Sequence, residues 1–303
     1  MRVDPSYVTN LVSALNQTQS NTQQLSSELS SGVRVTSLSQ DPLAAGENVL
    51  LLNQMQQDDS FTQSSSLVTG QLQVADSALG QVVSQLDQAI SLATSANNGT
   101  MNASNRQSFA NQISGILSEV LTLANSSYQG QFIFAGGKTA SAPFSLSNAT
   151  SPATVAYAGD QDVNYLESPN GQKVQLNVPG DRIFAGAGAN SVFAALNSLV
   201  ADYSANVPNS AQAVADTTAL GTALNYVSQQ RVTIDNSITH LNAASNAVSS
   251  EETQLTAAQT NLMQADVAQV STQLAMSETQ QTALEDVIAQ IGSTSLFDKL
   301  PIG

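Results

Sequence analysis

Apolar residues recur alternately three and four positions apart at both ends of the chain, which is the spacing of a coiled-coil seam. The N-terminal seam consists of Val8, Leu11, Leu15, Thr18, Thr22, Leu25 and Leu29. The C-terminal seam consists of Val267, Val270, Leu274, Ser277, Gln281, Leu284, Ile288 and Ile291. The matching periods predict that the two ends pair as one antiparallel coiled coil. Polar residues interrupt both seams, so we expect the pair to be marginal by itself and to order when copies of the chain pack together.

The chain between the two ends also carries helical spacing. Asp41-Pro42 predicts a helix start, with Asp41 as N-cap and Pro42 at the first helical position, and this helix runs toward about Asn97. Ser104 and Gln107 form a capping-box pattern that predicts a second helix. Further helices are predicted after residue 191 and across residues 227–262, and the heptad register of the last one slips near Asp266.

The period changes in the middle of the chain, where short runs rich in Val, Phe, Tyr and Ile alternate with Gly, Pro, Asn and Asp. The strand candidates are Thr154–Tyr157, Val163–Leu166 and Lys173–Val178, and a turn is predicted at Pro169-Asn170-Gly171. The predicted fold class is therefore mainly α with a β insertion. We expect a terminal coiled-coil domain (1–40 and 268–303), a helical bundle domain (41–130 and 206–267) and a central β-rich domain (131–205).

Charge and composition narrow the range of partners. The formal net charge is −15, which disfavours nucleic acid and anionic membrane surfaces because both are bound by basic patches. No apolar run is long enough to predict membrane insertion. The first residues lack the apolar core of a secretory signal peptide, so we expect any export to proceed without a cleaved signal.

Two motifs resemble ligand sites, but both matches are incomplete. Gly136-Gly137-Lys138-Thr139 resembles the end of a phosphate-binding loop, but Phe132 stands where that loop needs its first glycine. Asp160-Gln161-Asp162 resembles the opening of a calcium loop, but Tyr165 and Gly171 occupy the positions that require Gly and Glu. We therefore predict no cofactor, and a turn is favoured over a metal site, although a weak cation site stays open.

The remaining polar groups do not form a catalytic pattern. His240 is the single histidine and the chain has no cysteine, so we expect His240 on a helix surface. The adjacent carboxylates Asp58-Asp59 and Glu251-Glu252 point to different faces of their helices, and we expect them to be solvated or to lie between subunits. No residue is predicted to be catalytic, and the chain is predicted not to be an enzyme.

Four segments carry residues in a recognisable order. They contain Gly32, Arg34, Asp41 and Pro42 in the first segment, Phe132, Ile133, Phe134, Gly136 and Lys138 in the second, Tyr157–Asp160 as the third, and Gly180, Asp181 and Phe184 in the fourth. Together they resemble the motifs of the flagellar hook-associated protein 3 family, the flagellin-like proteins of the hook–filament junction. Residues 295–300 are similar to the end of those proteins, whereas Val33 stands where they have Lys.

The resemblance implies a structural subunit of the bacterial flagellum, an adaptor ring that joins hook-associated protein 1 to the flagellin filament. The implied partners are copies of the chain itself, hook-associated protein 1, flagellin, and an export chaperone on the C-terminal helix. The implied location is extracellular, after type III export. We expect the apolar members of the two terminal seams, from Val8 to Leu29 and from Val267 to Ile291, to form the assembly interface. The alternative is a flagellin that polymerises into a filament.

Overall fold

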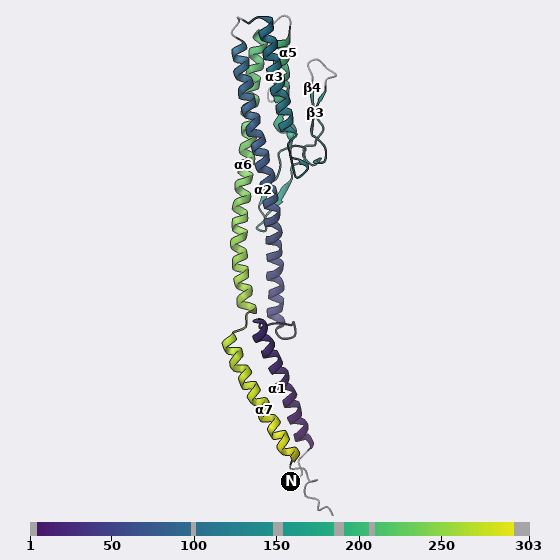
Figure 1. Ribbon diagram of the computed structural model, residues 1–303, viewed down its shortest axis with the longest axis vertical. Coiled ribbons are helices and arrows are strands. Elements are labelled where there is room, and N and C mark those ends of the chain that lie inside the picture. The colour runs from purple at the N-terminus through teal and green to yellow at the C-terminus, as the bar shows by residue number, and fades with distance from the viewer. Residues whose placement is uncertain (1–4, 98–100, 148–153, 185–190, 206–209, 294–303) are drawn as a thin grey trace, which may run out of the picture. The chain divides into compact units, whose positions relative to one another are not determined.

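The computed structural model describes residues 5–97, 101–147, 154–184, 191–205 and 210–293, and confirms a mainly α fold with a β insertion (Figure 1). The helices are α1 (Pro5–Ser31), α2 (Pro42–Ala96), α3 (Ala103–Ala124), α4 (Gly180–Phe184), α5 (Val192–Ser204), α6 (Ser210–Met263) and α7 (Val267–Ser293). The strands are β1 (Ser127–Tyr128), β2 (Gln131–Phe132), β3 (Phe144–Ser147), β4 (Thr154–Tyr157), β5 (Tyr165–Glu167) and β6 (Lys173–Gln175). The described strands pair antiparallel as β1-β2, β3-β4 and β5-β6.

Polar side chains fix the starts of the helices. The Asp41 carboxylate accepts a hydrogen bond from the Ala44 amide at 3.0 Å, which confirms the predicted N-cap of α2. The helix predicted from Ser104 and Gln107 is present as α3, but the predicted cap was wrong, because Asn102 is the N-cap and accepts from the Asn105 amide at 2.8 Å. Asp266 caps α7 by accepting from the Ala268 amide at 3.0 Å, so the predicted slip in register is a break between two helices.

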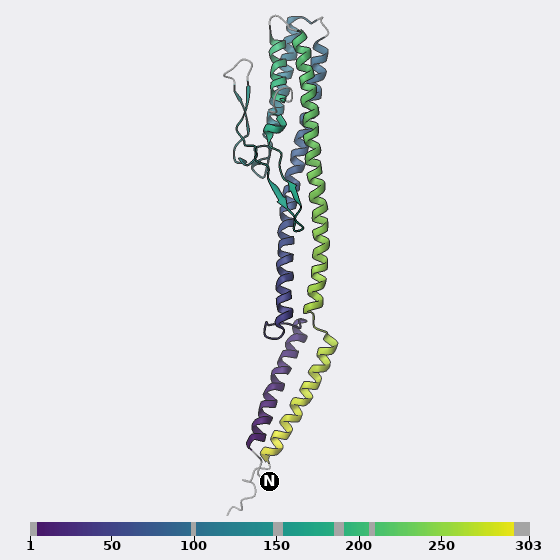
Figure 2. The same ribbon diagram turned by 180° about the vertical axis from the view of Figure 1, so that it is seen from behind.

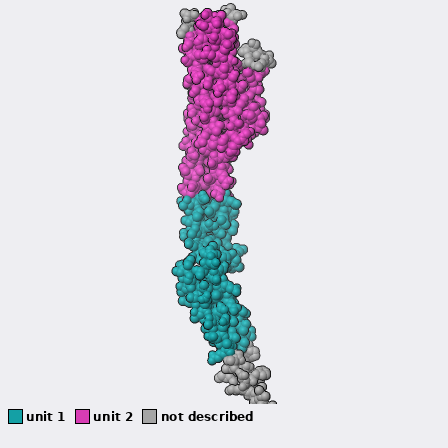
Figure 3. All heavy atoms as spheres, in the orientation of Figure 1, with its two compact units in different colours: residues 1–56, 251–303 teal, residues 57–250 magenta. Residues whose placement is uncertain are grey.

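The chain separates into two compact units (Figure 3). Unit 1 combines residues 1–56 with residues 251–303, and unit 2 consists of residues 57–250. Helices α2 and α6 contribute residues to both units. The predicted division had three domains, whereas residues 131–205 belong to the same compact unit as most of the helical bundle.

The core of unit 2 is built from the predicted helical seams. One face of α2 is fully buried from Leu72 to Ala93, and it lies in one cluster with buried side chains of α3, α5 and α6. Helices α3 and α5 pack side by side, as both views show (Figures 1 and 2). Leu79, Leu86, Ile113, Leu196 and Leu220 have no exposed surface, so unit 2 has a continuous apolar core of its own.

An aromatic cluster joins the β segments to this helical core. The ring centroids of Phe134 and Phe184 are 5.4 Å apart, and Phe144 lies 5.4 Å from Phe184 and 5.3 Å from Phe193. Such spacings favour edge-to-face and tilted contacts. The Gly180 amide donates to the Phe134 carbonyl at 2.8 Å, which places this motif glycine against the rings. Residues 131–205 therefore share one core with the helices.

The β region differs in detail from the sequence prediction. Strand β4 and the turn at Gly171, whose φ is +82°, confirm the predictions there. The predicted strand Lys173–Val178 ends early, because the Asn177 side chain bonds the Asn164 amide at 2.8 Å and the Asp162 carbonyl at 3.0 Å. The same bonds delay β5, which begins at Tyr165 rather than Val163.

Two predictions about isolated polar groups had opposite outcomes. His240 is exposed on α6, as expected. Asp58 was expected to be solvated or to lie between subunits, but it has no exposed surface within the chain itself, whereas its neighbour Asp59 is exposed. The prediction failed for Asp58 because helical spacing separates the two side chains without showing which of them faces the packed side.

A carboxyl pair lies between α5 and α6. Burial is the main cause that raises the pKa of Asp202 to about 6, and the adjacent Asp216 carboxyl adds to the shift. Because of both effects, the folded chain holds the Asp202 proton more tightly than the unfolded chain, in which the Asp202 pKa has its ordinary value of 3.8. Ionisation of Asp202 therefore costs folding free energy, and stability falls as the pH rises from about 4 to about 6.

Substituting Gly180 tests the aromatic cluster. A Cβ atom at this position would lie 2.7 Å from the Phe144 ring and 2.8 Å from the Phe134 carbonyl oxygen. We expect Gly180→Ala to lower the free energy of unfolding by about 1–3 kcal/mol, because close packing tolerates no added atom there. Thermal unfolding followed by circular dichroism measures it. Gly115→Ala, where no atom lies within 4 Å, is the control and should not destabilise. Equal melting temperatures for the two variants would contradict this packing.

Removing the Asp202 charge tests the carboxyl pair. We expect Asp202→Asn to raise the melting temperature at pH 7 and to leave it nearly unchanged at pH 4, because the penalty exists only when Asp202 is ionised. Asp87→Asn, which removes an exposed carboxylate from α2, controls for the change in net charge. A rise in melting temperature at pH 4 as large as that at pH 7 would show that ionisation of Asp202 is not the cause of the destabilisation.

Candidate assembly site

Helices α1 and α7 pack side by side within unit 1, and their seam is thin (Figure 1). The predicted seam residues that are half-buried are Leu11, Leu15, Leu25, Leu29, Leu274, Leu284, Ile288 and Ile291. Val270 is buried, whereas Val8 and Val267 are exposed, 37% and 55% respectively, and do not lie in the packed seam. Whether these residues form contacts between subunits stays a prediction.

The middle of the seam is polar. Thr18 and Ser277 are both buried, and the hydroxyls of Thr22 and Ser277 lie 2.9 Å apart in a hydrogen bond between the two helices. A hydroxyl pair contributes less than the apolar burial it replaces, because its hydrogen bond exchanges for one to water. The pair therefore aligns α1 with α7 more than it stabilises them.

Unit 1 has few fully buried apolar side chains. Among its described residues, those classed as buried and hydrophobic are Val35, Ala44, Ala265 and Val270. Unit 2 holds the remainder of the buried hydrophobic side chains. Since apolar burial is the dominant favourable term in folding, unit 1 has little stabilisation of its own.

The first family segment forms the connection between α1 and α2, and it meets the connection between α6 and α7. Gly32, with φ at +68°, ends α1, and its carbonyl accepts from the Ala265 amide at 2.9 Å. The Arg34 amide donates to the Met263 carbonyl at 2.7 Å. We call this pairing of residues 32–34 with 263–265 the joint.

The Arg34 side chain closes the joint. Its guanidinium donates to the Asp41 carboxylate and to the Leu262 carbonyl, both at 3.1 Å. The hydrogen bond from the Ala44 amide, followed by that from Arg34, lowers the pKa of Asp41 below its ordinary value. The carboxylate thus caps α2 and holds Arg34 at once, which assigns a structural role to Gly32, Arg34 and Asp41, while Pro42 is the first residue of α2.

Exposed apolar side chains gather in unit 1. Those of its described residues are Tyr7, Val8, Val12, Leu38, Leu43, Val49, Leu50, Leu52, Val267, Met276 and Val287. Unit 2 is larger and shows fewer of them, namely Leu67, Leu146, Tyr165, Val214 and Val232. Because contiguous exposed apolar patches mark interaction sites, we expect such a site in unit 1 rather than in unit 2. Sequence reasoning missed the α2 members, although the run Leu50-Leu51-Leu52 was a usable signal, since a two-helix seam covers only one side.

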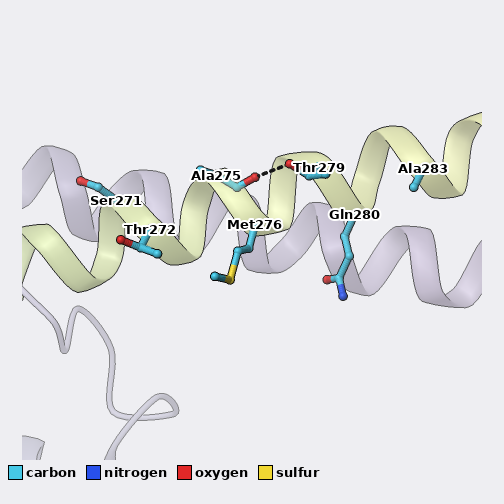
Figure 4. A pocket seen from close by; sticks show the side chains of 7 residues that line it. All are labelled: Ser271, Thr272, Ala275, Met276, Thr279, Gln280 and Ala283. Atoms are coloured by element: carbon cyan, nitrogen blue, oxygen red, sulfur yellow. Dashed lines mark hydrogen bonds between the residues drawn. The ribbon is translucent and has the colours of Figure 1, made fainter.

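One face of α7 is open, uncharged and shallow (Figure 4). A groove of about 850 Å³ follows it, with Met276 and Gln280 as its longest side chains and serine, threonine and alanine as the others. The hydroxyl of Thr279 donates back to the Ala275 carbonyl at 2.8 Å, which satisfies a polar group that faces the groove. Small side chains of this kind would let another helix approach closely.

The second and fourth family segments lie in unit 2 and are structural. Phe132 is half-buried, Ile133 and Phe134 are buried, and Lys138 is exposed. Gly136 has φ at +69°, and the Gly137 amide donates to the Asp160 carboxylate at 2.6 Å. This bond lowers the pKa of Asp160, with a smaller contribution from the Asp162 amide. The glycines therefore form a corner held by Asp160, and no helix follows them as in a phosphate-binding loop.

The fourth segment closes the same corner. Asp181 accepts from the Gln161 amide group at 2.7 Å, and Phe184 completes the aromatic cluster. Within the part of the chain that the structure describes, no three potential metal-binding side chains gather, and no helix is long and apolar enough to cross a membrane.

Comparison with known proteins gives concordant results. Residues 7–139 match the family model of the bacterial flagellin N-terminal helical region. The chain is 30% identical over 182 residues to flagellar hook-associated protein 3 of Salmonella typhimurium, across 60% of this chain and 56% of that protein. It is 28% identical over 237 residues to the Escherichia coli protein of the same name, across 71% and 73%. The match thus spans little more than half of the Salmonella relative.

A solved structure shares the fold. The crystal structure of the flagellar junction protein FlgL from Legionella pneumophila aligns with a TM-score of 0.57 at 14% identity, across 72% of this chain and 100% of that chain. At this identity the likeness concerns the fold alone.

Removing the Arg34 guanidinium tests the joint. We expect Arg34→Ala to speed hydrogen exchange of the Ala265 amide, because the pairing of residues 32–34 with 263–265 loses its side-chain closure. The free energy of unfolding should change little, since the ion pair is exposed and screened by solvent. Exchange measured by mass spectrometry decides the matter. Arg34→Lys keeps the charge but not the planar guanidinium, so its Ala265 amide should exchange at an intermediate rate. An unchanged exchange rate in Arg34→Ala would refute the role of Arg34 in closing the joint.

Proposed function

We propose that this chain is a member of the flagellar hook-associated protein 3 family, a structural subunit of the bacterial flagellum that joins the hook to the filament. The observation that carries the proposal is the imbalance within unit 1, whose described residues bury few apolar side chains and expose many. The matches to hook-associated protein 3, over 182 and 237 residues, support it.

In this proposal the terminal residues form the assembly domain. Residues 1–40 and 268–303 order when copies pack, residues 41–130 and 206–267 form the helical shaft, and residues 131–205 form the β-rich part. The chain acts as an adaptor ring between hook-associated protein 1 and flagellin, is exported to the flagellum, and is held beforehand by a chaperone on its C-terminal helix. Its role is mechanical, and no catalytic residue is assigned.

The second candidate is a flagellin, because the N-terminal match is to a helical region named for flagellins. The two functions differ in assembly: a junction protein forms a finite layer, whereas a flagellin polymerises without limit. Immunogold labelling of isolated flagella tests both. A single labelled band at the hook–filament boundary is expected. Label along the whole filament would favour a flagellin, and absence of label from flagella would refute both.

A charge in the terminal seam tests the assembly role. Leu274 is half-buried between α1 and α7, so we expect Leu274→Asp to abolish motility and junction labelling because the seam cannot accept an unpaired charge once it is covered. The thermal unfolding of the free chain should change little, since its stability resides in unit 2. Thr282→Asp, on an exposed position of α7, is the control and should keep motility. A large drop in the melting temperature of the Leu274→Asp chain would place the seam in the core of the monomer instead.

A further inference from the structure

A groove with an apolar floor runs between α2 and α6 in unit 1. Its volume is about 600 Å³, and Leu50 and Leu51 of α2 face Ala258 and Leu262 of α6 across it. The two helices are linked at this level by the Gln259 side-chain amide, which donates to the Asn48 side chain at 3.0 Å. Leu50 is 69% exposed and Leu43, one heptad before it, is 72% exposed. A lone pair of helices therefore leaves leucines on the groove side uncovered.

A ridge lies on the opposite flank of the same part of α2. Successive residues of an α-helix are rotated by about 100°, so Val49 and Leu52 point to the side of α2 away from the groove residues Glu47, Leu50 and Gln54. Val49 is 55% exposed and Leu52 is 47% exposed. One short segment of α2 thus carries an apolar hollow on one flank and an apolar projection on the other.

The ridge and the groove lie at the same level along α2. Residues 49 and 52 fall within the span 47–54 that lines the groove, a length of about 10 Å at the helical rise. Rotation of one copy about an axis parallel to α2, with no shift along that axis, would bring the ridge of one copy to the groove of the next. A contact of this head-to-tail kind closes into a ring when the rotation divides a full turn.

The charge pattern favours a second copy as the occupant. The chain carries a net charge of −15, so two copies repel wherever their acidic groups meet. In residues 42–57 of α2 the single charged residue is Glu47, on the groove side, and the ridge flank carries no acid to oppose it. Copies can therefore approach through this segment without like charges facing one another.

We propose that neighbouring copies of this chain join through α2, with the Val49–Leu52 ridge of one copy seated in the groove beside Leu50 of the next. The proposal rests on the proposed function, because it needs copies arranged side by side around a common axis. It assigns a direction to that arrangement, since every copy offers its ridge to one neighbour and its groove to the other.

Cross-linking between two single-cysteine variants tests the contact, and the natural chain contains no cysteine to interfere. Val49→Cys on the ridge and Asn261→Cys at the groove are produced together in the same cells as full-length chains with tags of different size. Flagella are isolated and treated with a short bismaleimide. A mixed dimer is expected when both variants are present, and no dimer is expected from either variant alone. Gln88→Cys, exposed on α2 in unit 2, replaces Val49→Cys as the control and should give no mixed dimer.

The outcomes separate this contact from the proposed function. If the chain is present on flagella but no mixed dimer forms, the contact is overturned and the function stands. Dimers of Val49→Cys with itself would indicate a symmetric contact and would also overturn the proposal. If the unsubstituted chain is absent from flagella, the proposed function is refuted together with the arrangement on which the contact depends.

A charge in the groove gives a second test of the contact. Leu50→Asp, added to the chain that carries Asn261→Cys, should lower the yield of cross-linked mixed dimer about tenfold or more, because the charge would be buried without a partner. Its melting temperature as a free chain should match that of the unsubstituted chain, since Leu50 is mostly exposed there. Leu67→Asp, at an exposed α2 position in unit 2, is the control and should leave the yield unchanged. An undiminished yield in Leu50→Asp would overturn the groove as the docking site.

Discussion

The scarcity of buried apolar side chains in unit 1 is the constraint on which its other features depend. Two long helices in contact can cover only one stripe of each other, and here Thr18, Thr22 and Ser277 occupy part of that stripe. The apolar groups that remain, from Tyr7 to Val287, are left on the surface. A chain with this balance gains the missing burial only from something that packs against it, which is the physical basis for regarding unit 1 as an assembly element.

Unit 2, in contrast, buries many apolar side chains. Helices α3 and α5 add to α2 and α6, so four helices and an aromatic cluster enclose a continuous core. The bidentate ion pair between Arg231 and Asp76, at 2.7 and 3.0 Å, ties α6 to α2 beside that core. Unit 2 therefore buries enough apolar surface to be stable without a partner. The chain therefore combines a self-sufficient part with a part that is incomplete.

Charge is placed to permit close packing of copies. Helix α1 contains one charged residue, Glu28, and this side chain is buried, with its carboxylate accepting from the Gln24 amide at 2.9 Å. Serine, threonine, asparagine and glutamine supply the polar surface of α1 instead. A strongly acidic chain associates with itself most readily where few acidic side chains are exposed. Helix α1, whose single acid is buried, and the first turns of α2, whose single charged residue is Glu47, meet that requirement.

The sequence by itself determined the helices, their seams and the family motifs, because heptad spacing and N-caps act over a few neighbouring residues. Asp41 as the cap of α2 and the buried face of α2 needed no tertiary information. Only the tertiary structure decided which distant segments meet. Arg34 bonds the Leu262 carbonyl across the joint, Gly180 seats against Phe144, and Asp58 is buried beside an exposed Asp59. Such contacts depend on the relative rotation of packed elements, which local spacing does not encode. The exposed leucines of α2 show the same limit, since a periodic pattern reveals which face is apolar but not how much of it a neighbour covers.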